Sequence, residues 1–112
     1  MGENVGRRVA SFSVEPATLR RIDQIIDYTR RQWGEQQAEL YIQNMFDCFA
    51  AIAAHQVLWR PIPSVFGIKG FVHRYRHHYV YWQALPGDTI AIFSILHERM
   101  DQSSVLGSDL GA

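Results

Sequence analysis

Apolar residues recur at spacings of three and four over two long stretches of the chain, which is the period of an amphipathic helix. The first stretch covers residues 16–33 and begins with a proline, a residue that suits the first helical turn. Gly34 interrupts the pattern before it resumes over residues 35–53. A glycine between two amphipathic helices predicts a helical hairpin, with Trp33 and Tyr41 in its core.

Shorter stretches carry the β-branched and aromatic residues typical of strands. These stretches are residues 9–14, 71–76, 79–85 and 89–96. The segments Arg76-His77-His78 and Pro86-Gly87-Asp88 separate the last three and predict tight turns, so that these strands should be antiparallel. Because residues 89–96 are almost wholly apolar, we expect this strand to be central in its sheet.

The resulting order, β-α-α-β-β-β, predicts an α+β fold. We expect the helical hairpin to pack on one face of a small, mainly antiparallel sheet, and the other face to remain partly open. Residues 60–63 contain two prolines and predict a loop. A single domain over residues 9–101 follows, with a flexible segment at residues 1–8 and a loose tail at residues 102–112.

Composition excludes several classes of protein. The 112 residues have room for one domain, and a hydrophobic content of 47% excludes an intrinsically disordered chain. The sequence contains no apolar run of about 18 residues, so we expect no contact with a membrane. Cys48 is the single cysteine, and the first eight residues do not resemble a secretory signal, which predicts a cytoplasmic protein. Neither a metal site nor a cofactor is predicted, because Cys48 lacks the spacing of metal ligands and fits a buried thiol.

The formal net charge of zero conceals an uneven distribution. Residues 1–59 carry six basic and seven acidic groups, residues 60–99 carry five and two, and the remainder carries two acidic groups. The charge is therefore −1, +3 and −2 in these segments. A neutral total argues against direct binding of DNA by bulk electrostatics. The basic surplus nevertheless falls on the predicted strands.

Five residues in this basic region are candidates for a functional site: Lys69, Arg74, Arg76, His97 and Arg99. Arg74 and Arg76 are two apart on one strand, so that both should project from one face toward an anionic partner. His97 follows the apolar strand and could act as a general acid or base. Arg99 could bind a phosphate on the same side.

Each of these assignments has a structural alternative. Arg99 could instead pair with Glu98 or Asp101 and close the sheet edge, and the arginines could simply belong to a solvated sheet face. The histidines at positions 77 and 78 fit turn residues better than metal ligands. The aromatic residues of the two strands could stack on bases, but they fit cross-strand core pairs better. The residue pattern alone leaves these alternatives open.

An ordered set of short motifs resembles the ParE-type toxins, within the ParE/RelE superfamily of bacterial type II toxin–antitoxin, or plasmid stabilisation, systems. The motifs run from about Val9 to Asp101. They are Tyr28 with Gln32-Trp33-Gly34, Gln37-Ala38, Tyr41, Phe49, Ile52-Ala53, Arg60-Pro61, Gly67-x-Lys69, Tyr79-Val80-Tyr81 and Ile95-Leu96-His97-x-Arg99-x-Asp101. The resemblance implies a small toxin that is neutralised by an antitoxin encoded beside it.

The resemblance implies two possible targets. ParE-type toxins inhibit DNA gyrase without catalysing a reaction, and Lys69, Arg74, Arg76, His97 and Arg99 would then contact the target. RelE-type relatives are ribosome-dependent mRNA endonucleases, in which Arg74, Arg76, His97 and Arg99 would be catalytic. The neutral charge and the ParE-like ending favour the first interpretation, so we lean against an enzyme. An inactive interaction module is a third hypothesis, and either a homodimer or a toxin–antitoxin hetero-oligomer would fit.

Overall fold

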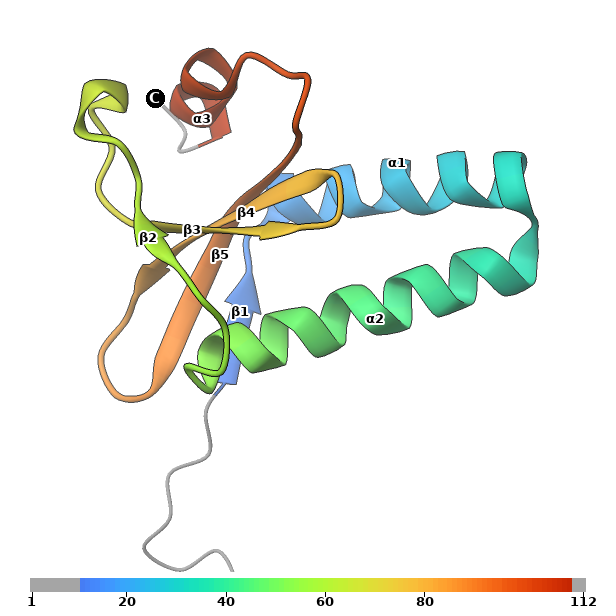
Figure 1. The fold of residues 1–112 in the computed structure, drawn as a ribbon, viewed down its shortest axis with the longest axis horizontal. Helices are drawn as coiled ribbons and strands as arrows, with labels where there is room; N and C mark the ends of the chain where they lie inside the picture. The colour runs from blue at the N-terminus through green and yellow to red at the C-terminus, as the bar shows by residue number, and fades with distance from the viewer. Residues whose placement is uncertain (1–10, 110–112) are drawn as a thin grey trace, which may run out of the picture.

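The computed structural model of the chain describes residues 11–109, and it has an α+β architecture (Figure 1). The elements, in chain order, are β1 (Ser11–Val14), α1 (Pro16–Trp33), α2 (Glu35–Ala53), β2 (Arg60–Pro61), the 3-10 turn η2 (Ser64–Phe66), β3 (Phe71–Tyr75), β4 (His78–Ala84), β5 (Thr89–His97) and α3 (Gln102–Asp109). The predicted order of strands and long helices is confirmed. Three short elements, β2, η2 and α3, are additions to it.

The five strands form one sheet in the order β1-β5-β4-β3-β2. The pairs β3–β4 and β4–β5 are antiparallel as expected, and β1 runs parallel to β5. The apolar strand β5 is interior, since it is flanked by β1 and β4. Its register with β4 skips Phe93, and this bulge allows both Ile92 and Ile95 to face the helical hairpin.

The helical hairpin covers one face of the sheet, as the sequence predicts (Figure 1). Gly34 joins the two helices with φ of 95°, a backbone conformation that a residue with a Cβ rarely adopts. We call the apolar layer between hairpin and sheet the hairpin-face core. Its buried members are Ile22, Met45, Phe49, Ile52, Ala53, Val80, Trp82, Ile90, Ile92 and Ile95.

The far end of the hairpin extends beyond the sheet (Figure 1). The sheet therefore covers the helices only over part of their length, and Trp33 at the tip is 71% exposed. The expectation that Trp33 is a core residue is wrong for this reason. Tyr41, which lies further from the tip, is half-buried against the hairpin-face core as expected.

The opposite face of the sheet is not open, which corrects two expectations. A second apolar layer, the opposite-face core, comprises Ile62, Val72, Tyr81, Phe93, Leu96 and Leu106. It is covered by α3 and by the segment around η2, which lie near each other in Figure 1. Residues 102–109 are therefore a docked helix and not a loose tail, because Leu106 of this helix is fully buried in the opposite-face core.

The proline-containing segment is also more ordered than expected. Arg60 and Pro61 form a short antiparallel strand against Val72 and Phe71. A proline is compatible with a strand at the edge of a sheet, where its missing N–H faces no partner. Gly70 precedes β3 with φ of +148°, and a Cβ there would lie 2.7 Å from the carbonyl oxygen of Trp82. Glycine is therefore required for this close approach.

The remaining differences are small. The turn after β3 contains two residues, and the third residue of the predicted turn, His78, already belongs to β4. The predicted flexible segment at residues 1–8 and the first part of the strand predicted at residues 9–14 lie outside the described residues. Among residues 11–109, neither long helix is apolar enough to cross a bilayer.

Candidate functional site

A cleft of about 900 Å³ opens between the hairpin and the end of the sheet where the β3–β4 turn lies. Residues of α1 and the start of α2 form one wall. The opposite wall consists of the β3–β4 turn together with the end of β5. Figure 1 shows that this turn points in the same direction as the hairpin tip, so that the cleft is bounded by both.

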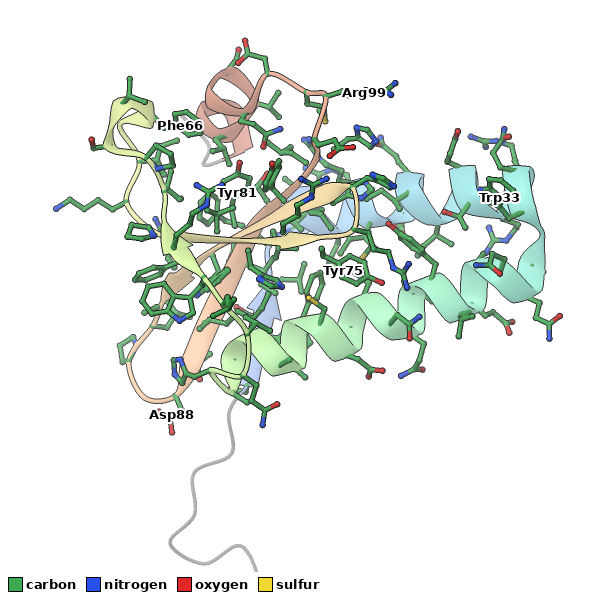
Figure 2. All side chains as sticks on the ribbon, in the orientation of Figure 1. Trp33, Phe66, Tyr75, Tyr81, Asp88 and Arg99 are labelled. Carbon is green, nitrogen blue, oxygen red and sulfur yellow. The ribbon has the colours of Figure 1, made fainter. Side chains whose placement is uncertain are left out.

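The helical wall of the cleft is one stripe of α1. Arg21, Ile25 and Thr29 follow one another at spacings of four, Tyr28 adjoins this row, and Trp33 continues it four residues after Thr29. Tyr28 is 58% exposed, and Trp33 lies at the hairpin tip in Figure 2. This wall therefore presents two large aromatic side chains to solvent at its outer end and the cation of Arg21 at its inner end.

Arg76 projects into the cleft because of an unusual backbone conformation. Strand β3 ends at Tyr75, and Arg76 adopts a left-handed conformation with φ of 54°. Its guanidinium lies 5.6 Å from the centre of the Tyr75 ring, and its Nε donates to the Tyr75 hydroxyl at 3.3 Å. This hydrogen bond, with the charge of Tyr75, raises the pKa of Arg76 further. The guanidinium is thus held at the rim of the cleft as a permanent cation.

Arg74 lies on the other face of the sheet from Arg76, and the expectation that both project from one face is wrong. The Arg74 guanidinium lies 5.8 Å from the centre of the Tyr79 ring, which packs against the opposite-face core. The Tyr75 ring beside Arg76 packs against the hairpin-face core. Strand alternation does not extend to Arg76, because the turn begins there.

Glu98 connects Arg74 with the turn. One of its carboxylate oxygens accepts from Arg74 Nη2, and the other accepts from His77 Nδ1 at 3.0 Å. The hydrogen bond from His77 is the main reason why the pKa of Glu98 is lowered, with smaller contributions from the charges of Arg74, His77 and His97. The sequence leaves Glu98 open as a partner of Arg99 at the sheet edge, but the structure pairs Glu98 with Arg74 instead.

Three histidines meet at the inner end of the cleft, and we call them the histidine cluster: His77, His78 and His97. His78 pairs with His97 in the β4–β5 register, and their ring centres lie 5.3 Å apart. The rings of His77 and His97 are stacked with centres 6.4 Å apart. The sequence shows these histidines in one basic stretch, but only the strand register brings them together.

His78 is the half-buried member of this cluster whose pKa is displaced most clearly. Burial, followed by the charges of His97 and His77, lowers its pKa to about 4. The Tyr41 hydroxyl of α2 lies 3.3 Å from His78 Nδ1 and can donate to the neutral ring. Burial also raises the pKa of Tyr41. The Tyr41–His78 contact is therefore neutral at physiological pH and joins the hairpin to the sheet.

The other candidates are more dispersed. His97 lines the cleft, and its Nδ1 accepts from the backbone N–H of Arg99 at 3.1 Å. The Arg99 side chain is exposed and points away from the body of the molecule in Figure 2. Lys69 is exposed in the segment before β3, where its carbonyl accepts from Gln83 Nε2. The cleft thus contains Arg76 and His97, but not Lys69, Arg74 or Arg99.

The described part of the chain offers neither a cluster of metal ligands nor a reactive thiol. Residues 11–109 contain no group of three histidine, cysteine, aspartate or glutamate side chains arranged to hold a metal ion. Burial raises the pKa of the Cys48 thiol to about 11. Cys48 is therefore protonated at neutral pH, as a structural cysteine packed against the hairpin-face core should be.

Comparison with known proteins identifies the family. Residues 12–102 match the family model of the ParE toxin of the type II toxin–antitoxin system parDE. The chain is also 35% identical over 86 residues to a toxin ParE of Escherichia coli, and this match covers 77% of the chain and 82% of that relative. The family-model match includes both helices of the hairpin and nearly all of the sheet. The chain therefore belongs to the ParE toxin family of type II toxin–antitoxin systems.

Proposed function

We propose that this chain is the active toxin of a cytoplasmic toxin–antitoxin pair and that it acts by binding a protein, DNA gyrase, without catalysing a reaction. Membership of the ParE toxin family supports the toxin role. The neutral net charge suits a protein target better than a nucleic acid. Lys69, Arg74, Arg76, His97 and Arg99 remain the proposed target-contacting residues, with Arg74 and Arg76 on different faces of the sheet.

One observation favours this proposal over an RNA endonuclease. A nuclease of this kind would need its cations gathered around one phosphate. In this chain Arg74 and Arg76 lie on opposite faces, and Glu98 already neutralises Arg74. Arg99 points outward (Figure 2). This arrangement supports contacts with a protein surface more readily than stabilisation of a phosphoryl transition state.

Inhibition of gyrase supercoiling by the purified chain tests the target. We expect inhibition that increases with the concentration of the chain and is abolished by the antitoxin encoded beside it. The control is the chain heated past its unfolding transition. Full supercoiling at a large molar excess of folded chain would exclude gyrase as the target.

Induction of the gene alone tests whether the toxin is active. We expect growth arrest that co-expression of the neighbouring gene relieves, whereas an inactive interaction module would leave growth unchanged. Primer extension on translated mRNA tests the endonuclease alternative in the same cells. Cleavage that His97→Ala and Arg74→Ala both abolish would favour that alternative over ours.

A further inference from the structure

The two edges of the sheet differ in how well they are protected from pairing with another chain. Strand β2, at one edge, is two residues long, contains Arg60 and Pro61, and is followed closely by Pro63. Short length, cations and prolines are the usual features that keep an edge strand unpaired. Strand β1 forms the other edge, and residues 9–14 contain neither a charge nor a proline. A segment of this length and composition is prone to pair with another strand.

The backbone of β1 presents hydrogen-bonding groups on its outer side. The N–H groups of Ser11 and Glu15 donate to carbonyls in or just before β5, at 3.1 and 3.0 Å. Backbone groups alternate in direction along a strand, so the N–H and carbonyl groups of Phe12 and Val14 point away from β5. Among residues 11–109, no strand pairs with this side of β1. Within the described chain, two N–H and two carbonyl groups are therefore open to an added strand.

The side chains of β1 favour a partner strand of the same kind. Ser11 and Ser13 are exposed on the side away from the hairpin. Phe12 and Val14 are half-buried against the hairpin-face core, and the Phe12 ring lies 6.1 Å from the ring of Phe46 on α2. A second β1 would match small hydroxyl side chains on one side and apolar side chains on the other. The net charge of zero means that two copies do not repel each other at long range.

We propose that β1 pairs antiparallel with β1 of a second copy of this chain about a two-fold axis, so that two five-stranded sheets become continuous. In an antiparallel pair, residues with outward backbone groups face each other. The register that uses all four open groups places Phe12 opposite Val14 of the second copy and Ser13 opposite its own counterpart on the axis. It also places Glu15 opposite Ser11, so that like charges do not face each other.

Pairing at this edge keeps the dimer contact away from the cleft. Strand β1 lies beside the end of α2, whereas the cleft involves the start of α2 and the β3–β4 turn (Figure 1). No residue of β1 is among the described residues that line the cleft. The dimer therefore carries two clefts, and a partner with two matching sites binds it more tightly than it binds one copy. The proposal requires neither gyrase nor an antitoxin, so it does not rest on the proposed function.

Oxidative cross-linking of the full-length chain tests the register. Opposing residues that share no hydrogen bond have Cα atoms about 4.5 Å apart, a distance that suits a disulfide. We expect Ser13→Cys to give a disulfide-linked dimer under mild oxidation. Ser11→Cys is the matched control on the same strand and side, because its Cα atom would lie about 14 Å from its counterpart. The parent chain should not cross-link, since its Cys48 thiol is half-buried and protonated.

Sedimentation velocity of the full-length chain over about 1–500 µM tests the association. The contact is small, so we expect a reversible dimer with a dissociation constant in the micromolar range. Ser13→Lys and Ser13→Glu each place like charges across the axis and should raise this constant by about three-fold to ten-fold. An equimolar mixture of the two should dimerise as well as the parent chain. Ser11→Lys, which faces Glu15, should cause no weakening. Circular dichroism confirms that each variant is folded.

Three outcomes would overturn the proposal. The first is a parent chain that stays monomeric at 500 µM. The second is equal cross-linking, or none, in Ser13→Cys and Ser11→Cys. The third is a dimer that Ser13→Lys and Ser11→Lys weaken equally or leave unchanged, which would place the contact on another surface. None of these outcomes bears on gyrase inhibition, so the proposed function is tested separately.

Discussion

The two faces of the sheet are covered by very different amounts of chain. The hairpin face is covered by two long helices, whose buried residues alternate with exposed ones over most of their length. The opposite face is covered by an eight-residue helix and a short 3-10 turn. The first cover presents a continuous apolar stripe, while the second depends on a few side chains such as Ile62 and Leu106. From this contrast we infer that the packing of the hairpin face contributes most of the global stability. We also infer that α3 can unfold locally while the rest of the domain stays folded.

The most severe test of this contrast is a cavity in the hairpin-face core. Phe49 is fully buried, and its ring meets Phe12 and Phe46 edge-on at 5.6 and 5.2 Å. We expect Phe49→Ala to lower the free energy of unfolding by about 3–5 kcal/mol. Urea denaturation followed by circular dichroism measures this change. Leu40→Ala, at an exposed position of the same helix, is the control, and equal losses in both would contradict the contrast.

A cavity between α3 and the sheet should lower the free energy of unfolding by a smaller amount. Leu106 is fully buried, and we expect Leu106→Ala to cost about 2–3 kcal/mol, at the lower end for a buried leucine, because α3 can open locally. Hydrogen exchange should show faster exchange in α3 than in β5 for this variant. Ser104→Ala, at an exposed position of α3, serves as the control. No measurable loss would return the segment to the loose tail that the sequence suggests.

The histidine that joins the hairpin to the sheet should contribute a pH dependence. The pKa of His78 is about 4 when folded, against about 6.5 for an unfolded chain. The unfolded state therefore binds a proton first, and the free energy of unfolding should fall as the pH decreases from about 6.5 to about 4. Because His78 is half-exposed, we expect about 1–2 kcal/mol.

Denaturation curves for the parent chain and His78→Gln over this pH range measure the effect. The glutamine cannot titrate, so that its variant should lose less stability between pH 6.5 and pH 4. Parallel curves for the two proteins would show that His78 is not responsible. Thermal unfolding at pH 7.5 controls for any loss of the Tyr41 contact that is independent of protonation.

The smallest effect is expected at the ion pairs that Glu98 forms with Arg74 and His77. Glu98→Gln removes the charge that Arg74 and His77 share, so the melting temperature at pH 7 should fall by less than in Leu106→Ala. Because the pKa of Glu98 is lowered on folding, this stabilisation is present above the ordinary pKa of a glutamate and is lost as the pH falls through the folded value. High salt should reduce the difference between Glu98→Gln and the parent chain, and a salt-independent difference would contradict this account.

Hydrophobic period and turn residues predicted the elements of the hairpin face well. The helices over 16–33 and 35–53 and the three antiparallel strands follow from long patterns that are interrupted by glycine or proline. Helix α3 could not be predicted in this way. Its apolar residues Val105 and Leu106 are adjacent and do not recur at a helical spacing among the polar residues around them. Periodicity also cannot show where the sheet ends beneath a helix, and Trp33 is exposed for that reason.

The candidate site was predictable in composition and less so in geometry. Its basic and histidine residues are visible in the sequence, and His97 and Arg76 do line the cleft. The direction of Arg76 depends on a left-handed backbone that strand alternation does not anticipate. The histidine cluster depends on the β4–β5 register. The contribution of α1 to the cleft wall depends on which part of the hairpin extends beyond the sheet.

The parallel pairing of β1 with β5 sets the order in which this chain can fold. Ser11 lies opposite Thr89, and their hydroxyls are hydrogen-bonded across a sequence separation of 78 residues. Contacts of such high contact order form slowly, whereas the hairpin is local and can form early. We expect stopped-flow refolding to show helix formation ahead of the burial of Trp82. During synthesis the apolar stripe of the hairpin stays uncovered until β5 has been made, so a folded copy exists only once nearly all of residues 11–109 have been synthesised.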